Sequence, residues 1–329
     1  MFRISCRSLK FAALLAVVVS SASLSAAAQN PGPSSSVERG VMVREAQIYL
    51  APDTSSAKLA QIQLGREVAI LERGAGQWLH VLATLREGGE QGDKSVTGWT
   101  LDKGIVRSST PNGERILFGE AAAAEMEAMR RGGRKGAELD ALRLYYRTWE
   151  YYPNSSVAGD ALYRAADIRW QLDRAEVLSR SSARQAEPIG NFEGIDERMM
   201  REVKKKFPES KWAALADFAM IDNKLCGDWQ LQSKCPVRES ERYEEYVKEY
   251  PQSPRLQEAL YQAARRRAAL IQIFLTEGSK SKSDESRQRA LTLAQRAVGV
   301  DATTDWGMRA QALVYKIEQQ IPTFGNLID

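Results

Sequence analysis

One four-residue pattern occurs three times in the chain, as Tyr152-Pro153-Asn154-Ser155, Phe207-Pro208-Glu209-Ser210 and Tyr250-Pro251-Gln252-Ser253. Each copy is an aromatic residue, a proline, a polar residue and a serine, and each lies between segments with helical periodicity. In every copy an alanine stands eight positions after the proline, and an aromatic residue stands ten positions after it. Self-similarity at fixed offsets is typical of helical-hairpin repeats, so the sequence predicts an α-helical repeat.

The residue types explain why such a pattern suits a helical hairpin. Proline ends the preceding helix, because the residue before it is driven out of helical geometry. The serine can cap the next helix by accepting a hydrogen bond from a free backbone amide. Alanine allows two helices to approach closely, and the aromatic ring fills the neighbouring gap. The predicted repeat-packing residues are Pro153, Ala161, Tyr163, Pro208, Ala216, Phe218, Pro251, Ala259 and Tyr261.

The pattern resembles the tetratricopeptide repeat over residues 137–310. The similarity is to the subtype found in periplasmic Tol–Pal and cell-division coordinators and in outer-membrane assembly lipoproteins. It implies an α-solenoid that binds other proteins. The prolines are 55 and 43 residues apart, against about 34 for the plain repeat. We assign the extra residues of the first interval to an irregular loop over Ser179–Ile195, called the excursion, which contains Pro188 and Gly190. We assign those of the second interval to the segment Cys226–Cys235.

Helical periodicity covers most of the chain after residue 115. A Gly/Ser/Lys-rich segment, 276–284, is expected to be a loop. The expected helices are 118–131, 137–152, 157–172, 197–207, 211–225, 236–250, 254–275, 286–298 and 305–321.

The first 28 residues read as a secretory signal, with a basic start, an apolar run over Phe11–Val19 and small residues before a cut between Ala28 and Gln29. An uncleaved anchor is the alternative. Residues 29–39 form a Pro/Ser-rich leader, which we expect to be a flexible tether. Removing the signal lowers the formal net charge from +4 to +1. A net charge this small does not indicate binding to nucleic acid. The mature chain has no other apolar stretch long enough to span a membrane.

Short strands separated by glycine turns occupy residues 40–107 and predict a small barrel. A first strand is expected over Val41–Leu50. Four segments in order resemble the bacterial SH3-type barrel of exported proteins: 51–56, 64–68, 77–81 and Gly98-Trp99. The resemblance implies a module similar to those that bind cell-wall peptides. The chain departs from the family at Ile48-Tyr49-Leu50, which lacks the usual arginine, and it has an insertion at Glu87–Ser95.

Five aromatic residues are candidates for partner binding. Tyr49, Trp78 and Trp99 could form the floor of a groove on the barrel, although core packing is the commoner role for Trp99. Trp170 and Trp229 are expected to be exposed anchors, because such residues are frequent in interfaces.

Only Cys226 and Cys235 remain after signal cleavage, with eight residues between them. In an exported chain they are expected to form a disulfide. A metal site is the rival interpretation, but two thiols and the single His80 cannot complete a four-ligand zinc site.

The motifs of catalysis are not found, so we expect no enzyme and no cofactor. His80 is interpreted as a surface residue of the barrel, and Gly132-Gly133-Arg134 follows a helix, where a phosphate loop would follow a strand. A hydrolase site among acids of the excursion, such as Glu193 and Glu197, is a weak third hypothesis. The basic runs at residues 130–135, 204–206 and 265–267 are interpreted as solvated faces, or otherwise as surfaces for an acidic partner, wall polymer or anionic lipid.

The expected fold class is therefore multidomain, an all-β domain followed by an all-α domain, as an SH3-like β-barrel and a tetratricopeptide-like α-solenoid. The expected function is that of a non-enzymatic adaptor, exported to the periplasm or envelope, that binds protein or peptide partners. The alternative is a peptidoglycan-targeting accessory protein that recruits or regulates a wall hydrolase. The expected parts are 1–28 signal, 29–39 leader, 40–107 barrel, 108–114 linker, 115–322 helical repeat and 323–329 tail.

Overall fold

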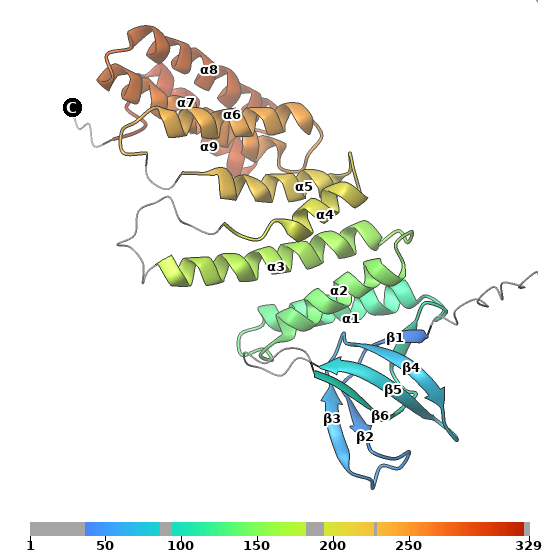
Figure 1. Ribbon diagram of the computed structural model, residues 1–329. Coiled ribbons are helices and arrows are strands. Elements are labelled where there is room, and N and C mark those ends of the chain that lie inside the picture. The colour runs from blue at the N-terminus through green and yellow to red at the C-terminus, as the bar shows by residue number, and fades with distance from the viewer. Residues whose placement is uncertain (1–36, 86–93, 182–193, 227–228, 326–329) are drawn as a thin grey trace, which may run out of the picture. The chain divides into compact units, whose positions relative to one another are not determined.

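The computed structural model describes residues 37–85, 94–181, 194–226 and 229–325. The expected signal peptide, its cleavage site, most of the leader and most of the excursion lie outside these ranges. Within them, an antiparallel sheet is followed by a series of helices (Figure 1).

Seven strands form one antiparallel sheet in the order β3-β2-β6-β5-β4-β1-β7. β3 and β7 are therefore the edge strands of an open sheet. Its inner side carries the alternate apolar residues of each strand, including Ile48, Val68 and Val81, all fully buried. The strands are β1 Glu38–Met42, β2 Ala46–Tyr49, β3 Lys58–Ile62, β4 Glu67–Arg73, β5 Trp78–Leu85, β6 Lys94–Leu101 and β7 Ile105–Arg107.

Three boundaries in the sheet differ from expectation. β1 begins inside the expected leader, because Glu38 and Arg39 pair with Ile70 and Ala69 of β4. The single strand expected over Val41–Leu50 is two strands, β1 and β2, which pair with different partners. β6 takes in the last two residues of the expected insertion Glu87–Ser95, and the rest of that insertion is not described.

Nine α-helices and one 3₁₀ helix, η1, follow within the described residues, and consecutive helices pack in pairs. Several helices are longer than expected. α1 begins inside the expected linker 108–114, α3 extends into the expected excursion, and α8 takes up half of the expected loop 276–284. The helices are α1 Gly113–Met129, α2 Ala137–Tyr151, α3 Ala158–Ser181, α4 Arg198–Lys206, α5 Lys211–Met220, η1 Ile221–Lys224, α6 Lys234–Glu249, α7 Leu256–Thr276, α8 Lys280–Val300 and α9 Asp305–Glu318.

The three aromatic-Pro-polar-Ser segments connect α2 to α3, α4 to α5 and α6 to α7. Ala161, Ala216 and Ala259 are fully buried in the hydrophobic clusters of these hairpins. The aromatic residues two positions later are half-buried, and the three prolines are exposed at the turns. Those aromatics are Tyr163, Phe218 and Tyr261, and the prolines are Pro153, Pro208 and Pro251.

The expected serine cap is present at only one of the three turns. Ser210 Oγ accepts a hydrogen bond from Ala213 N at 3.2 Å and caps α5. Ser253 instead accepts from Arg255 N at 3.0 Å and lies 2.5 Å from the Tyr246 hydroxyl. The Ser155 hydroxyl is buried without a hydrogen-bond partner among the described residues. In the first and third turns the helix starts three residues after the serine, so the serine does not occupy the position directly before the helix, from which a side chain caps it.

The sheet and the first two helices share one hydrophobic core. Val41 of β1 and Val106 of β7 are buried against Leu117 of α1 and Leu144 of α2. Hydrogen bonds reinforce the contact, since the Tyr152 hydroxyl donates to the backbone carbonyl of Arg107 at 2.5 Å. The expected linker is thus a short turn between packed elements.

Candidate functional sites

Four rings gather on the outward side of the sheet. Tyr49 of β2 is the register partner of Trp99 of β6, and Trp99 is the partner of His80 of β5. Trp78 lies two residues before His80 and therefore on the same side. The Tyr49 and Trp78 rings meet edge to face at 5.6 Å, and the His80 and Trp99 rings stack at 4.9 Å. We call Tyr49, Trp78, His80 and Trp99 the aromatic face.

Strand alternation explains why the aromatic face points outward. Leu79 and Val81 of β5 are buried on the inner side, whereas Trp78 and His80 between them are half-exposed. Leu82, the next outward residue of β5, is exposed. A cluster of half-exposed rings beside an exposed leucine is typical of a surface that contacts a partner.

Gly74 makes room for one ring of the aromatic face. A Cβ atom at Gly74 would lie 2.6 Å from Cζ3 of Trp99, closer than atoms can approach. Replacing Gly74 with alanine is therefore expected to displace the Trp99 ring, change the near-UV circular dichroism and cost about 1–3 kcal/mol of stability. Gly119→Ala is the matched control, because that glycine faces open space on α1 and alanine favours helix. Identical spectra for Gly74→Ala and the unchanged protein would contradict the packing described.

A second candidate site is an open groove of 660 Å³ between α4 and α6, which we call the α4–α6 groove. Glu197, Arg201, Lys204 and Lys205 line one wall at helical spacing. Met220 and Ile221 lie at the floor and are buried. The α6 wall consists of Arg242, Glu245, Tyr246 and Glu249.

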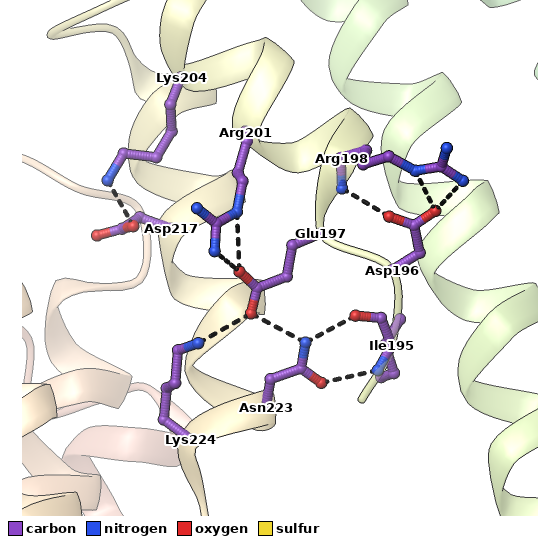
Figure 2. A network of polar contacts seen from close by, with 9 residues as sticks. All are labelled: Ile195, Asp196, Glu197, Arg198, Arg201, Lys204, Asp217, Asn223 and Lys224. Atoms are coloured by element: carbon purple, nitrogen blue, oxygen red, sulfur yellow. Dashed lines mark hydrogen bonds and ion pairs between the residues drawn. The ribbon is translucent and has the colours of Figure 1, made fainter. Parts of the chain in front are cut away.

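Glu197 is the centre of a polar network beside this groove (Figure 2). Its Oε2 accepts from Arg201 Nε at 3.1 Å and Nη2 at 2.6 Å, and its Oε1 accepts from Asn223 Nδ2 at 3.0 Å and Lys224 Nζ at 3.1 Å. Asn223 also bonds the backbone N–H and carbonyl of Ile195, at 3.0 and 2.8 Å. The network thereby fixes the segment that leads into α4.

The network changes the ionisation of Glu197. Burial raises the pKa of this carboxyl, but hydrogen bonds from Asn223, Arg201 and Lys224 outweigh burial and leave the pKa below its usual value. A carboxylate with a lowered folded-state pKa stabilises the fold above its unfolded pKa of about 4.3, and this stabilisation is lost as the pH falls through the folded value.

Glu197→Gln is therefore expected to cost about 1 kcal/mol at pH 7, because it removes charge-assisted hydrogen bonds. The difference from the unchanged protein should shrink at pH values below the folded pKa, where Glu197 is protonated in both states. Urea unfolding at neutral and acidic pH measures this difference in stability. Glu245→Gln is the control, since its pair with Arg242 is exposed. A pH-independent difference for Glu197→Gln would refute the role of its charge.

Lys204 connects the two walls of the groove. Its Nζ lies 2.6 Å from Asp217 Oδ1 and 3.8 Å from Glu249 Oε1 of α6, and 5.7 Å from the centre of the Tyr250 ring. The sequence interpretation of the run Lys204–Lys206 as a solvated face missed this contact, because Asp217 and Glu249 are distant in sequence.

The two cysteines lie where a disulfide is possible, with their Cα atoms 6.1 Å apart. Beside them, the buried Glu239 of α6 accepts from Cys226 N at 2.7 Å and from Trp229 Nε1 at 3.2 Å. Its other oxygen accepts from Nε of the buried Arg266 at 2.7 Å. This arrangement holds the cysteine segment against α6 and α7.

The structure corrects three expectations about surface residues. Trp170 was expected to be exposed but is 2% exposed, because it packs with Leu162, Ala166 and Met200 between α3 and α4. Trp229 is half-buried, bonded to Glu239 and 5.2 Å from the ring of Phe324, which was expected to lie in a loose tail. Arg266 was expected to be solvated in its basic run but is buried.

Two further features concern the described residues only. They contain no group of three or more His, Cys, Asp or Glu side chains placed to hold a metal ion. None of their helices combines the length and the apolar character needed to cross a bilayer.

Comparison with known proteins gives a weak structural likeness and no family. No protein-family model matches the chain, and no curated protein matches it. Among solved structures, a de novo designed helical repeat protein is similar over 63% of this chain and 94% of its own, with 14% sequence identity and a TM-score of 0.19. At that TM-score the likeness carries no argument about fold or function.

Proposed function

We propose that this protein is an exported, non-enzymatic adaptor of the bacterial cell envelope that binds protein or peptide partners. In this proposal the sheet, although open, is related to the SH3-like barrel, and the helical hairpins are tetratricopeptide-like repeats. The cysteine pair at disulfide distance supports export, because disulfides persist in oxidising compartments.

The observation that carries the proposal is the aromatic face. Tyr49, Trp78 and Trp99 come from three different strands and are brought together on one outward surface. Aromatic-lined surfaces bind extended peptides, and tryptophan and tyrosine supply much of the binding energy in protein interfaces. Such a surface needs no reactive group.

Capture from envelope extracts tests the proposal. Immobilised protein is compared with the double variant Trp78→Ala/Trp99→Ala, and bound proteins are identified by mass spectrometry. Loss of specific partners in the variant supports the proposal, and the same set of bound proteins in both would contradict it. Circular dichroism establishes that the variant remains folded.

The second candidate function, a peptidoglycan-targeting accessory protein, uses the same surface with a different ligand. Half-exposed tryptophan rings also suit stacking on a wall polymer. Sedimentation with purified peptidoglycan separates the two functions. Retention that disappears in Trp78→Ala/Trp99→Ala favours wall targeting, and no retention favours the adaptor.

A further inference from the structure

We infer that the α4–α6 groove is a second binding surface, which takes an acidic, extended peptide segment of a protein partner. The inference rests on the proposed adaptor function and gives it a surface whose chemistry differs from that of the aromatic face. The groove measures 660 Å³ and is open to solvent.

The first step is the hydrogen-bonding capacity of Glu197. An ionised carboxylate offers about four acceptor positions on its two oxygens. Four hydrogen bonds from Arg201, Asn223 and Lys224 occupy them, and the side chain is only 12% exposed. Glu197 therefore holds the surrounding cations in place and has no capacity left for a ligand.

The second step is the surplus of donors around this carboxylate. A guanidinium has five N–H groups and an ammonium has three, so Arg201 and Lys224 keep donors after bonding Glu197. Both are substantially exposed, Arg201 at 68% and Lys224 at 48%. Lys205 stands one turn from Arg201, is exposed, and has no ion pair among the described residues. Arg201, Lys205 and Lys224 all line the groove and therefore present unused positive donors, which suit carboxylate oxygens.

The third step is the opposite wall, which is less suited to a simple polyanion than to a peptide. Glu245 and Glu249 of α6 are exposed and face the same groove. Glu245 is paired with Arg242 of the same wall at 2.9 Å and Glu249 with Lys204 at 3.8 Å, so this wall is less favourable to a phosphate polymer or an anionic membrane than the basic side of the groove. A peptide suits both walls, because its backbone N–H groups can donate to Glu245 and Glu249 while its acidic side chains meet Arg201, Lys205 and Lys224.

The dimensions suit a short segment. Arg242 to Glu249 spans seven helical steps, or about 10 Å at 1.5 Å per residue. An extended chain covers this distance in about three residues. A segment with acidic side chains on alternate residues would place successive carboxylates on the same side, toward the basic wall.

Fluorescence anisotropy tests the inference with a rhodamine-labelled peptide, Gly-Glu-Ala-Glu-Ala-Glu-Gly, and its counterpart with glutamine in place of each glutamate. We expect the acidic peptide to bind and the glutamine peptide to bind at least about fivefold more weakly, with affinity falling as salt rises from about 50 to about 300 mM. The double variant Lys205→Gln/Lys224→Gln is expected to lose about five- to tenfold in affinity for the acidic peptide.

The matched control is Lys248→Gln/Arg296→Gln, which removes the same charge from the adjoining groove between α6 and α8. An equal loss in this control would overturn the inference, as would equal binding of both peptides, or no binding of the acidic peptide at about 1 mM. Stronger binding to vesicles of anionic phospholipid than to the peptide would also overturn it. Trp78→Ala/Trp99→Ala should leave peptide binding unchanged, so failure of the adaptor proposal remains distinguishable from failure of this one.

Discussion

Replacing Arg266 with methionine is expected to lower the free energy of unfolding by about 3–5 kcal/mol. Arg266 donates to the buried Glu239 at 2.7 Å and to the side chain of Gln262 at 2.9 Å, and its guanidinium lies 4.6 Å from the Tyr243 ring centre. Methionine fills much of the volume but leaves the Glu239 carboxylate buried without its cation. Urea unfolding followed by circular dichroism measures the loss.

Two further variants identify the cause of this loss. Arg265→Met, at the exposed neighbouring position, should change stability by less than about 0.5 kcal/mol. Adding Glu239→Gln to Arg266→Met should recover part of the loss, because the amide is neutral and its oxygen can still accept from Cys226 and Trp229. Equal and small effects of Arg265→Met and Arg266→Met would show that the ion pair contributes nothing.

Replacing Leu144 with alanine is expected to cost about 2–5 kcal/mol, because it opens a cavity in a fully buried site. Leu144 belongs to the cluster that contains Val41 and Val106 of the sheet and Leu117 of α1. The cavity should therefore weaken the sheet and the first helices together. Hydrogen exchange followed by mass spectrometry should show faster exchange in β1 and β7 as well as in α1 and α2.

The control for Leu144→Ala is Leu139→Ala on the same helix, where the side chain is exposed. It should change stability by less than about 0.5 kcal/mol. Faster exchange confined to the helices in Leu144→Ala would mean that the sheet is stable independently of them. That outcome would support the two separate domains expected from the sequence.

The repeated turn segments show where sequence reasoning was effective. The helices flanking Pro153, Pro208 and Pro251 are predictable because stop and start signals and helical periodicity are local properties. The burial of Ala161, Ala216 and Ala259 accords with their fixed offset from these prolines. The serine caps were less predictable, because a cap depends on the residue at which the helix begins.

The expectation that Trp170 is exposed was an error that its spacing from other apolar residues could have prevented. Leu162, Ala166 and Trp170 are spaced by four residues and so lie on one face of α3, and all three are buried. Arg266 is different, because the partner that permits its burial, Glu239, lies on another helix. Nothing in a single sequence indicates that pairing.

The aromatic face was partly predictable from the sequence, whereas the α4–α6 groove was not. Alternation in β5 predicts that Trp78 and His80 share one side of their strand. The contact of Tyr49 with Trp78 and its pairing with Trp99 depend on β2 lying next to β6, an order that the sequence does not specify. The α4–α6 groove was missed because its walls come from two different hairpins.

Partner contact at the aromatic face is tested most directly by photo-crosslinking in living cells. A benzoyl-phenylalanine at Leu82, on the outward side of β5, is compared with one at the exposed Tyr315 of α9. We predict a discrete protein adduct from position 82 that disappears when Trp78 and Trp99 are alanine, and no such adduct from position 315. An adduct from position 82 that persists without both tryptophans, or adducts only from position 315, would contradict the proposed binding surface.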